Sequence, residues 1–226
     1  MLYLLLFCLI SLLAYGPSLW VRYILRKYST PIPDMPGTGA ELATHLIKRF
    51  ELNEVKVIMG GRGENYYSPE EKIVCLSPDV HDGKSLTSVA VAAHEVGHAI
   101  QFNNDEAVTK LRQRYLGKAI MIKRAGSIIL MSIPVLTLLL KSPVIMFFAA
   151  AIGILTMLVS VLMYAAILPE EYDASYNKAL PILAQGYLPE EHMVAAKRIL
   201  KACALTYVAA ALADILSLWR WFRMIR

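Results

Sequence analysis

The stretch Ala90 to Gln101, AVAAHEVGHAIQ, decides how the rest of this sequence is interpreted, because it sets two histidines and a glutamate in an apolar run. On an α-helix His94 and His98 lie about one turn apart and about 40° from each other around the axis, so both imidazoles can bind one metal ion. Glu95 lies about 100° round from His94, where its carboxylate can reach a water on that ion without binding the ion itself. The stretch therefore predicts a Zn²⁺ site with two ligands and a general base.

The alternative is that these polar residues fall in a membrane helix by accident. The pattern His-Glu-x-x-His arises by chance in roughly one chain per hundred of this length, so the surrounding sequence has to decide. The apolar run that begins at Val89 is too short to span a bilayer, and charged and polar residues bound it on both sides. Ser85 can cap a helix at this point, and Gly97 leaves space beside an ion. We therefore expect a buried core helix over 85–101, outside the membrane.

The composition indicates a membrane protein. Hydrophobic residues make up 57% of the 226 residues, above the share of about 45–50% that is typical of soluble domains. Three apolar stretches are candidates for membrane spans, at 1–21, 125–168 and 199–219. The first lacks the basic start and the small-residue cleavage site of a signal peptide, so we expect a retained anchor. The second is too long for one span, and LLLKSPVIM at 138–146 predicts a turn between helices over 119–140 and 143–167.

These assignments predict a mainly α-helical fold, with three to four integral membrane spans and a small α+β, zincin-like catalytic region that carries the HExxH helix. The predicted order is a transmembrane anchor over 1–21, the catalytic region over 22–118, a transmembrane hairpin over 119–168, a third-ligand segment over 169–198, and a C-terminal transmembrane or interfacial helix over 199–226. Asp214 interrupts this last segment, which leaves both interpretations open. Because the hairpin leaves and re-enters the same face, the catalytic region and the third-ligand segment are expected to share one compartment.

The chain has 23 Lys+Arg and 18 Asp+Glu residues, and their placement predicts which side of the membrane the catalytic region faces. Basic residues cluster after the anchor, at Arg22, Arg26 and Lys27, and again before the central tract, whereas the loop inside that tract offers only Lys141. By the positive-inside rule the clusters, and the active site between them, face the cytoplasm. No basic stripe carries interleaved aromatic residues, so a nucleic-acid partner is not expected. The three cysteines have no CxxC spacing, which argues against a thiolate metal site.

The region between the anchor and the hairpin has a mixed pattern. Thr38 and Glu41 have the spacing of a capping box at the start of a helix. The segments VKVIM (55–59) and KIVCL (72–76) predict two short strands. The sequence GGRGENYYSPEE joins them and predicts a turn, because it lacks the GK[ST] ending of a phosphate loop. We expect one of these strands, with the 72–76 segment as the first choice, to pair with an extended substrate chain.

A catalytic zinc ion keeps three protein ligands and one open position, so a third ligand is needed. The downstream histidine of the pattern HExxHxxGxxH is missing, since Gln101 and Asn104 follow the helix. A distant carboxylate is therefore expected, and LPEEYDAS (168–175) offers Glu170 and Glu171 at the start of a helix. Spacing alone does not choose between them. Acids at a helix N-terminus also complement the helix dipole, which is the interpretation that we favour for Glu170.

Three segments around the hydrophobic hairpin, VAAHEVGHAIQ, LPEEYDAS and ALTYVAAAL, resemble the YugP-type neutral zinc metallopeptidases, a family of small bacterial membrane proteins. The likeness covers nearly the whole chain. That family is similar to the HtpX and CAAX-prenyl peptidases, whose third ligand opens an E-x-x-A-D pattern. Laid on EYDAS, this pattern matches Glu171 and Ala174, and so implies Glu171 as the zinc ligand. Ser175 stands where those relatives have Asp, so a carboxylate that orients a ligand histidine is missing at that position. Whether Asp173 takes over this orienting role is left open by the sequence.

The resemblance also makes ALTYVAAAL (204–212) part of the family pattern. Hydrolysis needs a group that stabilises the charge developing on the carbonyl oxygen, and Tyr207 is the candidate catalytic residue for this role. A tyrosine in such a helix can instead be a packing or interfacial residue. His192 is the rival candidate, whereas His45 and His81 are interpreted as surface or structural residues.

Together these features predict a membrane-bound zinc endopeptidase with Zn²⁺ as its cofactor. Zinc polarises a carbonyl and lowers the pKa of a bound water to about 7, while Glu95 takes the proton of that water. Glu171 follows the predicted third span by about three residues, or roughly 5 Å. The expected substrates are therefore proteins or peptides at or near the cytoplasmic membrane surface, and the lipid bilayer is a further partner.

Quality control of membrane proteins is the role expected of such an enzyme. The alternative is a non-catalytic metal-binding membrane scaffold, which would not need Glu95. A transporter is disfavoured, because the ionisable residues lie outside the predicted spans.

Overall fold

The computed structural model describes residues 2–140 and 142–212. The chain forms two compact units, each built from segments that are distant in sequence. The site unit comprises residues 20–109 and 169–206. The apolar unit, within the described residues, comprises 2–19, 110–140, 142–168 and 207–212. Helix α1 (Leu2–Lys27) contributes residues to both units.

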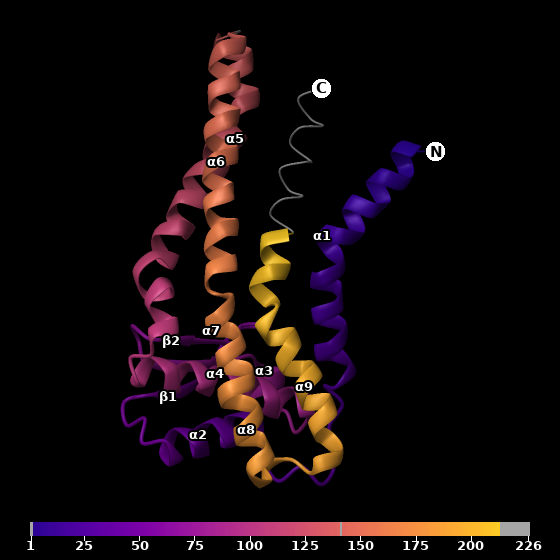
Figure 1. Cartoon of the computed structure of the whole chain (residues 1–226), viewed down its shortest axis with the longest axis vertical. Coiled ribbons are helices and arrows are strands. Elements are labelled where there is room, and N and C mark those ends of the chain that lie inside the picture. The colour runs from indigo at the N-terminus through magenta and orange to yellow at the C-terminus, as the bar shows by residue number, and fades with distance from the viewer. Residues whose placement is uncertain (1, 141, 213–226) are drawn as a thin grey trace. The chain divides into compact units, whose positions relative to one another are not determined.

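The site unit is a small α+β structure made of two stretches of chain (Figure 1). The first stretch holds α2 (Gly39–Arg49), β1 (Lys56–Met59), β2 (Tyr66–Ser68), β3 (Ile73–Leu76), α3 (Pro78–His81), α4 (Leu86–Asn103) and the short 3-10 helix η1 (Ala107–Thr109). The second holds α7 (Leu168–Tyr172), the π-helical η3 (Asp173–Ala179), α8 (Leu180–Ile182), the π-helical η4 (Leu183–Tyr187) and α9 (Glu190–Ala204).

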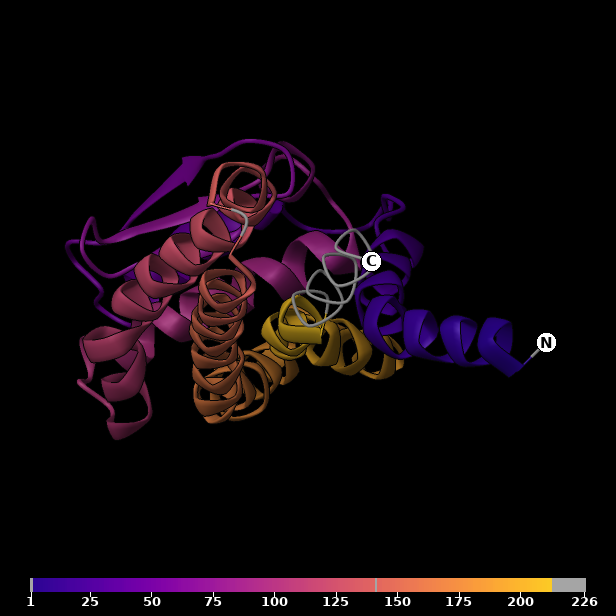
Figure 2. The same ribbon diagram turned by 90° about the horizontal axis from the view of Figure 1, so that it is seen from above.

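Helix α4 is the core of the site unit. The hydroxyl of Ser85 caps it and accepts a hydrogen bond from the Ser88 amide at 3.1 Å. Every residue from Leu86 to Gln101 is buried, because α4 lies between the sheet on one side and η3 and α9 on the other (Figure 2). The prediction of a buried core helix that starts after Ser85 is confirmed.

The three strands form one sheet in the order β1-β3-β2. Strand β1 pairs with β3 in parallel, with Lys56 opposite Ile73, and β2 pairs with β3 antiparallel, with Tyr66 opposite Cys75. The two predicted strands are confirmed. The expectation that the 72–76 segment pairs with a substrate is wrong, because β3 is the central strand and both of its edges are already hydrogen-bonded. The outer edges of the sheet belong to β1 and β2.

The predicted capping box at the start of α2 is confirmed. The Thr38 hydroxyl accepts a hydrogen bond from the Glu41 amide at 3.2 Å, and the Glu41 carboxylate accepts one from the Thr38 amide at 2.7 Å. Two of the amide donors that a helix start leaves without helical partners are thus satisfied. The apolar face of α2, with Ala43 and Leu46, is buried in the site unit, where α2 packs against α4.

The last turn of α1 is fixed to the start of α4 by two hydrogen bonds. The Thr87 hydroxyl donates to the Leu25 carbonyl at 2.7 Å, and the Thr87 amide donates to the Tyr28 carbonyl at 3.1 Å. Val21 and Ile24 are buried beside this junction. The C-terminal part of α1 therefore belongs to the site unit.

The apolar unit contains a helical hairpin. The π-helical turn η2 (Arg112–Leu116) leads into α5 (Gly117–Leu140), and α6 (Pro143–Ala166) runs back beside it (Figure 1). Gly126 and Gly153 allow this close packing, because a Cβ at Gly126 would collide with the Thr156 side chain and one at Gly153 with the Leu130 side chain. Large apolar side chains cover the outside of the hairpin, among them Ile128, Met131, Val135, Leu139, Val144, Phe147, Phe148, Leu155 and Leu162.

The prediction of three to four membrane spans is wrong. Within the described residues, one helical segment, Pro143–Tyr187, is long and apolar enough to cross a membrane, and its apolar window has a mean hydropathy of 2.6. This segment begins with α6. The mainly helical character, in contrast, was predicted correctly.

Local features explain why the other predicted spans differ. Helix α5 has Lys118, Lys123 and Arg124 near its start, which shortens its apolar part. Helix α9 ends at Ala204, inside the apolar stretch of 199–219, so that stretch is not one continuous helix. Residues 213–219 of the predicted C-terminal span, together with Asp214, lie outside the described residues.

Candidate metal centre

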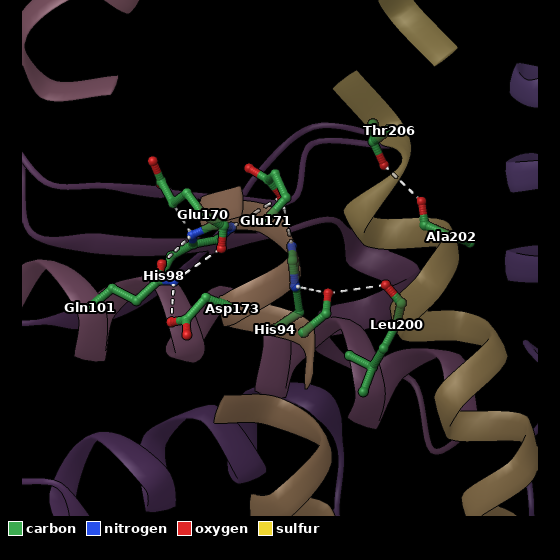
Figure 3. Close-up of polar contacts among 10 residues, drawn as sticks. His94, His98, Gln101, Glu170, Glu171, Asp173, Leu200, Ala202 and Thr206 are labelled. Atoms are coloured by element: carbon green, nitrogen blue, oxygen red, sulfur yellow. Dashed lines mark hydrogen bonds and ion pairs between the residues drawn. The ribbon is translucent and has the colours of Figure 1, made fainter. Parts of the chain in front are cut away.

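Three side chains from two elements converge in the site unit. His94 and His98 lie on consecutive turns of α4, and Glu171 lies on α7 (Figure 3). Their side chains are almost completely buried, with 5%, 3% and 2% of their surface exposed. One ligand atom from each of the three lies within 4.8 Å of the other two. The structure thus brings together the three residues that the sequence suggested as metal ligands.

The spacing of these atoms fits a zinc ion. The Glu171 Oε2 atom lies 3.4 Å from His94 Nε2 and 3.3 Å from His98 Nε2. In a tetrahedral site with zinc–ligand bonds of about 2.0–2.1 Å, neighbouring ligand atoms are about 3.4 Å apart. Two imidazoles and a carboxylate are also a donor set that catalytic zinc sites use. The residues present could therefore hold the ion.

The Glu171 carboxyl is held in its charged form by its neighbours. Burial acts to raise its pKa, but the charge of His98 and hydrogen bonds with His94 and His98 outweigh burial, and the net effect lowers the pKa. A cation placed between these side chains would act in the same direction. A buried carboxylate that stays ionised next to two imidazoles is chemically suited to be a metal ligand.

Glu95 follows His94 on α4 and is 7% exposed. Burial first, and then the negative charges of Glu95 and Glu171, raise the pKa of the Cys203 thiol. Burial first, with smaller contributions from the charges of Glu64 and Glu95, raises the pKa of the Cys75 thiol. Glu95 is thus a buried acid on α4, next to His94 in the sequence, and its role as a general base stays a prediction.

Each histidine also contacts an oxygen through its other ring nitrogen. His94 Nδ1 lies 3.1 Å from the Ser175 hydroxyl, which in turn donates to the Leu200 carbonyl at 3.0 Å. His98 Nδ1 lies 3.0 Å from Gln101 Oε1 and 3.4 Å from Glu170 Oε1. A hydroxyl therefore takes the place beside His94 where the resemblance indicated a missing carboxylate.

Gln101 joins the histidines to the α7–η3 segment. Its amide group donates to the Glu170 carbonyl at 3.0 Å and to Asp173 Oδ2 at 2.8 Å (Figure 3). Asp173 is thus connected to His98 through Gln101. The sequence interpretation missed Gln101, although its position one turn after His98 on the same helix face was a usable signal.

Glu170 also differs from its sequence interpretation. It was interpreted as an acid that complements a helix N-terminus, but its side chain is fully buried and lies against His98. Nothing in the local sequence distinguishes these two environments, because they depend on a contact with α4, which precedes Glu170 by about 70 residues.

Gly97 allows α4 and η3 to approach closely. A Cβ at this position would lie 2.8 Å from the Ala174 carbonyl oxygen and 3.3 Å from the Lys178 Cβ. The sequence suggested that Gly97 leaves space beside the ion, and this explanation of the glycine is wrong. The neighbouring backbone fills that space, and the short helix–helix distance brings Glu171 to the histidines.

Tyr207 belongs to the apolar unit. Its ring packs against Tyr164, with centroids 5.7 Å apart, and the Arg112 guanidinium lies 5.9 Å from its centroid. It is also one of the partly buried residues around the small core of Ala119, Met163 and Ile167. These contacts match the packing alternative, and its part in stabilising an oxyanion stays a prediction.

The remaining histidines lie elsewhere in the site unit. His45 Nε2 contacts the Tyr187 hydroxyl at 2.8 Å, and His81 Nδ1 lies 2.6 Å from Asp82 Oδ1. His192 Nε2 lies 3.6 Å from the exposed Glu191 carboxylate. None of the three joins the group of His94, His98 and Glu171 among the described residues.

Comparison with known proteins places the chain among zinc peptidases. A family model described as "Putative neutral zinc metallopeptidase" matches residues 3–226. The chain is also similar to "Putative membrane protease YugP" of Bacillus subtilis (strain 168), with 29% identity over 221 residues, which cover 96% of this chain and 95% of that protein. No solved structure gives a significant match. The resemblance of VAAHEVGHAIQ and LPEEYDAS is thereby confirmed, and the chain belongs to this metallopeptidase family.

Proposed function

We propose that this chain is a membrane-associated zinc endopeptidase that hydrolyses peptide bonds of proteins at or near the cytoplasmic membrane surface. The observation that carries the proposal is the convergence of His94 Nε2, His98 Nε2 and Glu171 Oε2 within a buried site, one residue from Glu95. Membership of a zinc metallopeptidase family supports the same chemistry.

The residues divide the chemical work between them. His94 and His98, through Nε2, and Glu171, through Oε2, would hold the ion. Zinc, when bound, supplies a Lewis acid that polarises the peptide carbonyl and makes a water acidic near neutral pH. The Glu95 carboxylate takes the proton of the attacking water and passes it to the leaving nitrogen. Burial of all four side chains keeps bulk water away and strengthens these interactions.

Three observations support a location at a membrane. The relative from Bacillus subtilis is named a membrane protease. Helix α6 is apolar enough to cross a bilayer, and Phe147, Leu155 and Leu162 on its surface are each more than 60% exposed. Glu171 follows Ala166, the last residue of α6, by five residues, which even a fully extended chain spans in at most about 18 Å. The ligand therefore cannot lie far from the end of this apolar helix.

The basic residues after the apolar part of α1 support a cytoplasmic site. Arg22, Arg26 and Lys27 lie at the end of this helix, in or next to the site unit. The cytoplasmic parts of membrane proteins carry an excess of Lys and Arg close to the bilayer. Substrates would then be membrane proteins or chain segments close to the bilayer, and we propose a role in the turnover of such proteins.

An extended substrate chain would add to an outer strand of the sheet. Of the two outer strands, β2 is the one beside α4, where Tyr67 packs against Phe102 with ring centroids 5.7 Å apart. We therefore move the proposed pairing from the 72–76 segment to β2. Backbone hydrogen bonds to an edge strand give affinity with little sequence preference, as expected of an enzyme that degrades varied proteins.

The variant Glu95→Gln tests the proposed function. It should retain zinc and lose hydrolysis of both casein and a membrane-anchored substrate, because the amide cannot accept the proton of the water. Glu54→Gln is the matched control, since Glu54 is an exposed glutamate paired with Lys72 on the surface, and it should cleave like the unaltered protein. Unchanged cleavage by a zinc-loaded Glu95→Gln protein would exclude the mechanism, and absence of cleavage by the unaltered protein would favour the scaffold alternative.

A further inference from the structure

Both candidate ligand histidines are held at Nδ1 by a neutral oxygen. We propose that Ser175 and Gln101 are positioning residues that keep His94 and His98 with the proton on Nδ1 and turn both Nε2 atoms toward the metal. The proposal rests on the zinc site of the proposed function, but it does not depend on peptide hydrolysis. A carboxylate is a common orienting partner of zinc-bound histidines. In this proposal a serine hydroxyl and a glutamine amide oxygen take that role.

The hydrogen-bond direction at Ser175 follows from its second partner. A hydroxyl can donate one hydrogen bond, and the Leu200 carbonyl, 3.0 Å away, can only accept. The Ser175 proton is therefore committed to Leu200, and the hydroxyl oxygen must accept from His94 Nδ1–H, at 3.1 Å. Ser175 has no exposed surface, so water does not compete for either bond.

The same reasoning fixes the orientation of the Gln101 side-chain amide. Its NH₂ group faces the Glu170 carbonyl at 3.0 Å and the Asp173 carboxylate at 2.8 Å, and both of these groups need a donor. The amide oxygen consequently faces His98 Nδ1 at 3.0 Å and accepts its proton. Glu170 Oε1 is farther from the same nitrogen, at 3.4 Å, beyond the usual length of about 2.9–3.0 Å for such a bond.

Asp173 and Lys178 anchor this network. Asp173 accepts a hydrogen bond from Asn177 at 2.7 Å and lies 3.7 Å from Lys178 Nζ. Lys178 in turn binds Glu106, just beyond α4, at 2.8 Å. The charge of Asp173 is thus balanced outside the histidine pair. Gln101 connects Asp173 to His98 through its neutral amide, so the Asp173 carboxylate orients His98 without contacting it.

The arrangement also explains why serine suits position 175. An oxygen between His94 Nδ1–H and the Leu200 carbonyl must accept from one and donate to the other, and an ionised carboxylate cannot donate. The variant Ser175→Asp should therefore not improve zinc binding, although it restores the residue of the E-x-x-A-D pattern. A gain in zinc affinity with Ser175→Asp would contradict the proposed role of the Leu200 carbonyl.

The test uses the full-length protein in detergent, loaded with zinc and labelled with ¹⁵N at histidine. Two ring Nδ1–H signals should be protected from exchange with water, one from His94 and one from His98. The variant Ser175→Ala should remove or shift the His94 signal and leave that of His98, whereas Gln101→Met should do the reverse. A role in general packing would not produce this crossed pattern.

Zinc affinity provides the second readout. Competition with a chelator should show a roughly 10–100-fold weaker affinity for Ser175→Ala and Gln101→Met, as is typical of residues that orient metal ligands. Ser88→Ala is the matched control, because Ser88 is a buried serine on α4 whose hydroxyl donates to the Asp79 carbonyl and does not contact either histidine. Its zinc affinity should equal that of the unaltered protein.

Several results would overturn the proposal. Equal zinc affinity in Ser175→Ala and the unaltered protein would do so, as would an equal loss in Ser88→Ala. Loss of the His98 signal in Glu170→Gln but not in Gln101→Met would assign the positioning role to Glu170. If Ser175→Ala fails to fold, Ser175→Cys keeps a similar volume with a much weaker hydrogen bond and should show the same loss. A protein that binds zinc normally but cleaves nothing would refute the peptidase function and leave this proposal standing.

Discussion

The close contact at Gly97 gives a quantitative test of how the centre is assembled. In Gly97→Ala the new Cβ would lie 2.8 Å from the Ala174 carbonyl oxygen, whereas ordinary contact begins near 3.4 Å. The η3 backbone must then move away by about 0.6 Å. Glu171 lies about one turn before Ala174 and should move with it. Metal–ligand distances in functional sites stay within about 0.2 Å of their ideal values, so we expect zinc affinity to fall by about tenfold or more.

The stability of the metal-free protein should change much less. Alanine is favoured over glycine in a helix by about 1 kcal/mol, whereas overpacking of a tight contact costs about 1–3 kcal/mol. The free energy of unfolding of metal-free Gly97→Ala should therefore lie about 0–2 kcal/mol below that of the unaltered protein. Zinc affinity and stability should therefore respond differently to this substitution. Zinc affinity depends on the exact position of Glu171, whereas the free energy of unfolding depends on the sum of the helix preference and the overpacking cost.

Chelator competition measures the first effect, and urea unfolding of the metal-free protein in detergent measures the second. Gly117→Ala is the control, since a Cβ at Gly117 meets nothing within 4 Å. Its zinc affinity should stay close to that of the unaltered protein, and its free energy of unfolding should be equal or higher by up to about 1 kcal/mol, because alanine is favoured over glycine in a helix. If Gly97→Ala bound zinc as tightly as the unaltered protein, the close approach of α4 and η3 would not be what positions Glu171.

Three further predictions follow from other parts of the structure. Zinc at a free concentration of 100 times its Kd should stabilise the protein by about 2.7 kcal/mol, so calorimetry should show a lower Tm after chelation, and an unchanged Tm would count against a bound ion. Thr38→Ala breaks the capping box of α2 and should lower the free energy of unfolding by about 1 kcal/mol in urea titrations, whereas no loss would disprove its contribution. Phe147→Ser with Leu155→Ser, on the exposed face of α6, should reduce sedimentation with phospholipid vesicles, whereas Glu54→Gln should not; equal sedimentation would argue against contact of this face with lipid.

Local signals allowed much of the site unit to be predicted from its sequence. The caps at Thr38 and Ser85 depend on residues within one helical turn, so their hydrogen bonds follow from spacing. The apolar character of α4 and the positions of His94 and His98 are set by the helical repeat in the same way. Strand β2 was missed because its three residues lie in a segment dominated by turn residues, and its pairing with β3 stabilises it.

Contacts distant in sequence could not be predicted. Ser175 meets His94 across 81 residues and Gln101 meets the Glu170 carbonyl across 69, so no local pattern shows which partner each one has. Glu171 could be identified as the third ligand only through a family pattern, because its spacing from the histidines does not distinguish it from Glu170. The number of spans was overestimated because hydropathy alone does not show where a helix ends, as it does at Ala204.

The most direct test of the central claim is a crystal structure of the zinc-loaded protein with anomalous diffraction measured on both sides of the zinc absorption edge. We predict one anomalous peak about 2.0–2.2 Å from His94 Nε2, His98 Nε2 and a carboxylate oxygen of Glu171, with Ser175 and Gln101 bound to the two Nδ1 atoms. A peak coordinated by Glu170 in place of Glu171, or no peak between the two histidines, would contradict the account.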